Sequence, residues 1–74
     1  MKFFELVDEL WAGKKIRRKG WHETILYLYC DLRDRNYLYI DRQKDMDGVR
    51  YISSWQWTPS LDEFEHDDWE IVND

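Results

Sequence analysis

Apolar residues repeat at two spacings along the chain, and the change of spacing predicts the order of its elements. From Phe3 to Ala12 they recur at steps of three and four, which predicts an amphipathic helix. Further along, apolar and aromatic residues alternate with polar ones in short runs typical of strands. The predicted strands are 15–18, 25–32, 36–42, 49–55 and 69–72. Ser60, with capping-box spacing to Glu63, predicts a second short helix that buries Leu61 and Phe64.

The two central strands each have two different faces. Alternation places one set of side chains on a tyrosine face and the other on an aliphatic face. The first set is Ile25, Tyr27, Tyr29, Tyr37 and Tyr39, and the second is Leu26, Leu28, Cys30, Leu32, Leu38 and Ile40. We expect the strands to form a hairpin whose aliphatic face packs on the N-terminal helix, with Cys30 as a buried, inert thiol. The polar stretch 43–48, ending in Asp47-Gly48, predicts a turn.

The expected fold class is therefore α+β, within a single domain 1–74. An N-terminal amphipathic helix packs on a small antiparallel sheet, and a second short helix lies near the C-terminus. No run of about 18 apolar residues is present, so no transmembrane helix and no membrane partner are expected. The single Cys30 excludes an intrachain disulfide, which favours an intracellular setting.

The composition predicts a binding surface in addition to the fold, and the charge is unevenly distributed along the chain. Aromatic residues make up 18% of the 74-residue chain, too many for one small core, so some should face a ligand or a partner subunit. The net charge of −5 is unevenly spread. Residues 14–19 hold five cations, whereas residues 61–74 hold seven acidic residues and no basic one. The chain is thus bipolar.

Motifs for catalysis are missing from the sequence. His22 and His66 lie far apart, and Ser53 and Ser54 have no nucleophile-elbow glycines beside them. No Walker or dinucleotide-binding glycine pattern occurs. His66-Asp67-Asp68 reads as a solvated acidic loop, because adjacent residues seldom converge on one ion. We therefore expect no enzyme, with no catalytic residues, no metal site and no cofactor.

The segment from Lys14 to Trp21 predicts a site for a phosphorylated ligand, since arginine pairs phosphate oxygens and an indole can stack on a base. A solvated basic strand beside a core tryptophan is an equally good interpretation. The negative net charge disfavours direct binding to duplex DNA. The tyrosine face is either the outer face of a half-buried sheet or an interface, and the acidic stretch is either solvating charge or a mimic of nucleic-acid phosphates.

Two segments together resemble a known family. The first segment is the opening helix followed by Gly13-Lys14-Lys15-Ile16-Arg17-Arg18-Lys19-Gly20-Trp21. The second segment is Trp57-Thr58-Pro59-Ser60, which leads to Asp67-Asp68-Trp69-Glu70. In this order the two segments are similar to small phage and prophage proteins of the Thoeris anti-defense 2 type. The resemblance covers residues 3–21 and 57–72. It implies a non-enzymatic sponge that forms homo-oligomers, a dimer or typically a tetramer, and acts in the cytoplasm of the infected bacterial host.

The resemblance also implies a ligand, namely a cyclic nucleotide-type immune signal such as a cyclic ADP-ribose. Carried over by position, the pocket candidates are Arg17, Arg18, Trp21, Trp57 and Ser60. The central region, residues 22–56, does not match the family pattern, and His22-Glu23 replaces the small polar and glycine turn of many relatives.

An alternative function belongs to a different class. Acidic prophage proteins of this size also resemble anti-CRISPR inhibitors, which bind a CRISPR effector nuclease directly. The acidic side chains of Asp62, Glu65, Asp67 and Asp68 would then meet a basic nucleic-acid channel, and Tyr27, Tyr29, Tyr37 and Tyr39 would add contact area. A structural or regulatory phage protein without a ligand is a third possibility.

Overall fold

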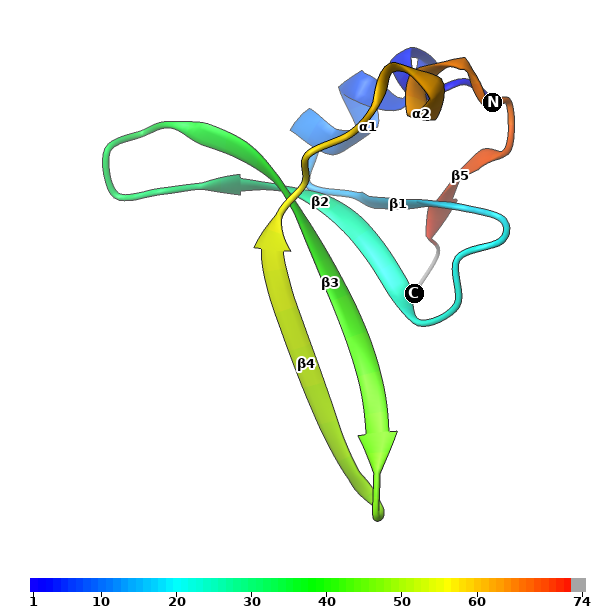
Figure 1. The fold of residues 1–74 in the computed structure, drawn as a ribbon. Helices are drawn as coiled ribbons and strands as arrows, with labels where there is room; N and C mark the ends of the chain where they lie inside the picture. The colour runs from blue at the N-terminus through cyan, green and yellow to red at the C-terminus, as the bar shows by residue number, and fades with distance from the viewer. Residues whose placement is uncertain (73–74) are drawn as a thin grey trace.

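A five-stranded antiparallel sheet forms most of the molecule, with short helices on one of its faces (Figure 1). The computed structural model describes residues 1–72. The helical elements are η1 (Phe3–Leu6), α1 (Val7–Trp11) and α2 (Leu61–Glu65). The strands are β1 (Lys15–Arg18), β2 (Thr24–Cys30), β3 (Asn36–Met46), β4 (Val49–Gln56) and β5 (Trp69–Val72). Their order across the sheet is β4-β3-β2-β1-β5.

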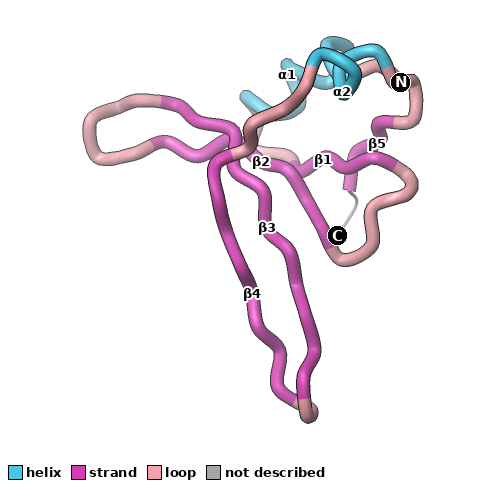
Figure 2. The backbone as a smooth tube through the Cα atoms, in the orientation of Figure 1, coloured by secondary structure: helices cyan, strands magenta, loops and turns pink. Residues whose placement is uncertain are grey.

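The predicted fold class is wrong in its balance of elements. Strands take up 47% of the described residues and helices 19%, so the fold is α+β but dominated by the sheet (Figure 2). The expected helix from Phe3 to Ala12 is a 3₁₀ turn followed by five α-helical residues. Leu6 at their junction has φ −107° and ψ 6°, which is outside the α region and interrupts a regular helix.

The sheet is larger than expected because β3 and β4 continue past the body of the protein. The predicted turn over 43–48 is also wrong, since only Asp47 and Gly48 turn and residues 43–46 pair with β4. Positive φ angles of 52° and 78° at Asp47 and Gly48 suit the two-residue turn of a twisted hairpin. Polar residues are stable in this strand because both faces of the projecting hairpin are solvated (Figure 1).

Seven buried residues form the core between the helices and one face of the sheet. They are Phe3, Leu6, Leu10, Ile16, Leu26, Ile40 and Trp69. The prediction that the aliphatic strand face packs on the N-terminal helix is confirmed. Trp69 lies among other aromatic rings, with centroids 5.4 Å from Phe3, 5.1 Å from Trp21 and 5.8 Å from Trp57.

Three expectations about individual side chains are wrong. Cys30 is exposed, because it ends β2 beyond the cover of the helices. Leu61 is 82% exposed, whereas Phe64 on the same helix stacks on Phe4 with centroids 5.2 Å apart. Ser60 does precede α2, but its side chain makes no capping hydrogen bond, so the predicted capping box is absent.

Candidate functional site

Four tyrosines gather on the sheet face that the helices leave uncovered, which we call the open face. The register of β2 and β3 sets Tyr27 opposite Tyr39 and Tyr29 opposite Tyr37. The ring centroids of Tyr29 and Tyr39 are 5.1 Å apart, and those of Tyr27 and Tyr39 are 6.4 Å apart. The prediction of a separate tyrosine face is confirmed, and the rings of Tyr27, Tyr29 and Tyr39 form one continuous group.

Strand β1 adds positive charge to this open face. Ile16 is a core residue paired with Leu26, so the flanking Lys15 and Arg17 point to the opposite, tyrosine side of the sheet. Arg17 donates from Nε to Glu70 Oε1 over 3.0 Å, and 41% of its side chain is exposed. The open face therefore combines aromatic rings and cations on neighbouring strands.

A hydrogen-bonded group fixes one edge of the tyrosine cluster. The Tyr27 hydroxyl donates to Asp41 Oδ1 over 3.0 Å, and Ser54 Oγ donates to the same oxygen over 2.6 Å. Partial burial, followed by the contact with Asp41, raises the pKa of Tyr27 above its usual value. The phenol is therefore held neutral and oriented.

Arg18 lies on the other face of β1 and is occupied by acidic partners. It makes a two-pronged bond to Asp68, with Nε–Oδ1 2.9 Å and Nη2–Oδ2 3.1 Å, and its Nη1 lies 3.5 Å from Glu63 Oε2. The hydrogen bond from Arg18 lowers the pKa of Asp68, and the same bond raises the pKa of Arg18. These carboxylates occupy the guanidinium edge that a phosphate would use.

Two arginines of the basic segment are thus paired with carboxylates of the acidic segment at the β1–β5 pair. Arg17 is opposite Glu70 in the register, and Arg18 is opposite Trp69, next to its ion-pair partner Asp68. Local sequence patterns do not indicate this pairing, because 53 residues separate Arg17 from Glu70 and 50 separate Arg18 from Asp68. The two charged poles are neighbours in space.

The five predicted pocket residues do not all come together. Trp21 and Trp57 are half-buried against Trp69, and Trp57 also packs on Phe3 and Phe64 at 5.4 and 5.8 Å. Arg18 lies on this same helix side, opposite Trp69 in the register. Ser60 is exposed at the start of α2. Arg17 alone of the five is on the open face.

The predicted acidic contact residues also have different environments. Asp62 and Glu65 are exposed on α2. Asp67 Oδ1 lies 3.5 Å from the Met1 ammonium nitrogen, and Asp68 is paired with Arg18. The acidic surface expected from the sequence is therefore partly compensated by positive groups.

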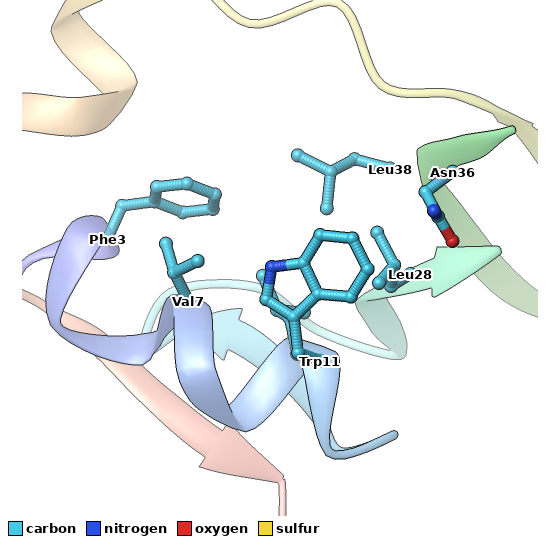
Figure 3. A pocket seen from close by; sticks show the side chains of 7 residues that line it. Phe3, Val7, Trp11, Leu28, Asn36 and Leu38 are labelled. Atoms are coloured by element: carbon cyan, nitrogen blue, oxygen red, sulfur yellow. The ribbon is translucent and has the colours of Figure 1, made fainter. Parts of the chain in front are cut away.

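Sequence reasoning missed an apolar groove beside α1. A volume of about 250 Å³ lies between the N-terminal helices and the ends of β2 and β3 (Figure 3). Its lining comes from Phe3, Val7, Leu10, Trp11, Leu28, Asn36 and Leu38. Trp11 continues the apolar repeat of the N-terminal helix but is 62% exposed at the rim. Asn36 is the single polar side chain in the lining, so the groove offers no cation to a phosphate.

Residues 1–72 contain no cluster of three or more potential metal ligands. Within the same range, no helix has the length and apolar character needed to cross a membrane.

Comparison with known proteins gives one match. The model of the Tad2-like family, described as the Thoeris anti-defense 2-like domain, matches residues 1–72. No curated protein and no solved structure matches the chain. The comparisons lend no support to the anti-CRISPR alternative. Because the family model spans nearly all of the 74 residues, including the central region that the sequence resemblance left out, the chain belongs to the Thoeris anti-defense 2-like family.

Proposed function

We propose that this protein counters Thoeris immunity without catalysis, by binding and sequestering a small anionic nucleotide-type signal, such as a cyclic ADP-ribose or cyclic nucleotide. The observation that carries the proposal is the open face, where Lys15 and Arg17 on β1 lie on the same side of the sheet as the tyrosines, with Lys15 opposite Tyr27 of β2 in the register. Such a signal has flat bases and charged phosphates joined in one compact molecule. The open face offers a complement to both.

The two groups of side chains have separate roles in this proposal. A nucleobase stacks on the ring of Tyr27 or Tyr39, because tyrosine rings bury flat apolar area at little entropic cost. Within residues 1–72, the Arg17 guanidinium bonds only to Glu70, and it does so through Nε. Its two terminal nitrogens can therefore donate to a phosphate. Lys15 is exposed and adds a second positive charge.

The helix-side arginine fits this role less well. A phosphate at Arg18 would have to displace the two-pronged Asp68 bond and approach Glu63, which is 3.5 Å from the guanidinium. Repulsion between phosphate and carboxylate opposes that exchange. We therefore assign Arg18, Trp21 and Trp57 mainly to holding β5 and the helices together.

The chemistry of the open face favours storage of a ligand over its conversion. The Tyr27 phenol is hydrogen-bonded to Asp41, and its raised pKa keeps it neutral at physiological pH. A neutral, engaged phenol is a poor nucleophile and a poor general base. A signal bound there is expected to be released without chemical change.

The proposal can be tested by titrating the protein with cyclic ADP-ribose and with cyclic dinucleotides in a calorimeter. Arg17→Ala should weaken binding roughly tenfold or more, the usual loss for a hydrogen bond to a charged group. Glu70→Gln breaks the same ion pair but keeps the cation, so it should leave binding intact or improve it. Tyr27→Phe should bind like the wild type, whereas Tyr27→Ala should bind more weakly. Arg33→Ala, in the exposed β2–β3 loop, is the control for general charge loss.

Two results would contradict the proposal. One is a lack of binding to every cyclic nucleotide tested by a folded wild-type protein. The other is normal binding by Arg17→Ala together with loss in Arg18→Ala and Trp21→Ala. That pattern would assign the ligand to the helix side, where Arg18, Trp21 and Trp57 lie.

A further inference from the structure

Five residues, one from each strand, form a single row across the open face, which we call the cross-strand row. The registers of the β4–β3, β3–β2 and β1–β5 pairs, with the β1–β2 pair of Ile16 and Leu26, determine its members. In order from β4 to β5 they are Ser54, Asp41, Ile25, Arg17 and Glu70. The row therefore holds an acidic group on β3 and a basic group on β1, with an apolar residue of β2 between them.

Asp41 uses only one of its two carboxylate oxygens inside the protein. Its Oδ1 accepts hydrogen bonds from the Tyr27 hydroxyl over 3.0 Å and from Ser54 Oγ over 2.6 Å. Within residues 1–72, Oδ2 accepts no hydrogen bond, and it is not among the buried atoms that lack a partner, so it is accessible to solvent. Because each carboxylate oxygen can accept hydrogen bonds, Oδ2 is a free acceptor that the two bonds at Oδ1 hold in place.

Asp41 and Arg17 are not paired with each other in the part of the chain that the structure describes. Arg17 donates to Glu70 on its other side, and the half-buried Ile25 separates it from Asp41. Neighbouring strands lie about 4.8 Å apart, so about 10 Å separates the Cα atoms of Asp41 and Arg17. The free oxygen of Asp41 and the terminal nitrogens of Arg17 thus flank an apolar position with room for one sugar ring.

We propose, on the basis of the sequestration inferred for this face, that Asp41 Oδ2 accepts a hydrogen bond from a ribose 2′-hydroxyl of the bound signal. The open face then selects ribonucleotides that keep a free 2′-hydroxyl. In a nucleotide the sugar lies between the base and the phosphate. A base stacked on Tyr27 or Tyr39, with a phosphate at Arg17, therefore places the sugar over Ile25 and beside Asp41. A carboxylate recognises a ribose hydroxyl in the same way in dinucleotide-binding folds.

The charge of Asp41 favours a hydroxyl group over a phosphate at this position. An ionised carboxylate can only accept hydrogen bonds, so it needs a donor, which a hydroxyl supplies and an ionised phosphate does not. Repulsion between two anions drives the phosphate away from Asp41 and toward Lys15 and Arg17 on β1. Asp41 thereby sets the direction in which the ligand lies across the strands, with its sugar toward β3 and its phosphate toward β1.

Titration of paired ligands tests this selection. Cyclic ADP-ribose and cyclic di-AMP are each titrated in a calorimeter beside the analogue in which every ribose 2′-hydroxyl is replaced by hydrogen. The measured quantity is the dissociation constant of the deoxy form divided by that of the ribo form, for each signal that binds. For the wild type this ratio should be about ten or more, the usual effect of a hydrogen bond to a charged group.

Substitutions of Asp41 should remove the discrimination between the two forms. Asp41→Ala should lower the ratio to the value that sugar pucker alone sets, close to one. Asp41→Asn keeps an acceptor for Tyr27 and Ser54 but replaces the free oxygen by an amide NH₂ group, so its ratio should also fall. Asp45→Asn is the matched control and should keep the wild-type ratio, because Asp45 lies on the same face of β3 and is paired with Arg50 at 3.5 Å.

The results that contradict the selection differ from those that contradict sequestration. Circular dichroism first establishes that each variant is folded. If the folded wild type binds neither form of either signal, sequestration itself is contradicted, and the selection with it. Equal binding of the two forms by the wild type would overturn the selection and leave sequestration in place. Weaker binding of both forms by Asp41→Ala at an unchanged ratio would do the same, because Asp41 would then act only by positioning Tyr27.

Discussion

Trp69 connects β5 to three other aromatic rings, those of Phe3, Trp21 and Trp57, and its substitution by phenylalanine tests how much this position contributes to stability. The indole is 1% exposed, packs against three rings, and donates from Nε1 to the Glu63 carbonyl oxygen over 2.9 Å. Trp69→Phe keeps an aromatic ring but removes the donor. The lost hydrogen bond and the unfilled volume should each cost about 1 kcal/mol, or about 2 kcal/mol of unfolding free energy together.

The loss can be measured by thermal and urea unfolding, followed by circular dichroism. For a domain of this size, about 2 kcal/mol corresponds to a melting temperature about 8 to 16 °C lower. Trp11→Phe is the matched control, because Trp11 is 62% exposed and should change the unfolding free energy by less than about 0.5 kcal/mol. Equal effects of the two substitutions would refute the central position of Trp69 in the core.

Three other predictions concern single side chains. Arg18 lowers the pKa of Asp68 in the folded protein, so the ionised carboxylate stabilises the fold above its unfolded pKa of about 3.9. In urea unfolding, the wild type should therefore be more stable than Asp68→Asn at neutral pH, and this difference in unfolding free energy should vanish as pH falls through the folded pKa. Because the pKa of Tyr27 is raised, an ultraviolet titration should show one tyrosine that is still protonated at a pH above about 10, where a free tyrosine ionises. The protein should lose stability as pH rises through the folded pKa of Tyr27, and this loss should be smaller in Asp41→Asn. Gly48→Ala should cost about 1 kcal/mol in urea unfolding, because φ is +78° there although space is open.

Local patterns in the sequence predict much of the fold. Strand β1 and strand β5 have the bounds that their residues indicate, and the alternation in β2 and β3 correctly separates the tyrosines from the core. Gly13 ends the helical segment with φ +89°, as a left-handed cap should. Each of these features depends on neighbours within a few residues.

Features that depend on distant partners could not be predicted in this way. Residues 43–46 have the polar character of a turn, and only their pairing with β4 makes them a strand. Ser60 and Glu63 have the spacing of a capping box, but the Glu63 side chain contacts Arg18 instead. The pairing of Arg17 with Glu70 likewise needs the β1–β5 register. For the candidate site, the consequence is that Arg17 and Arg18 lie on opposite faces of the sheet. Arg17 keeps nitrogens free to bind a phosphate, whereas the Arg18 guanidinium is bonded to Asp68.

Recovery of a captured signal tests the central claim most directly. The wild-type protein is mixed with cyclic ADP-ribose at a known ratio, filtered to remove free ligand, heated to unfold the protein, and filtered again for mass spectrometry of the released material. The proposed sequestration predicts that the signal disappears from the first filtrate, is retained much less by Arg17→Ala than by Glu70→Gln, and returns with unchanged mass after heating. Failure of the protein to retain any cyclic nucleotide signal, or release of a cleaved product, would contradict it.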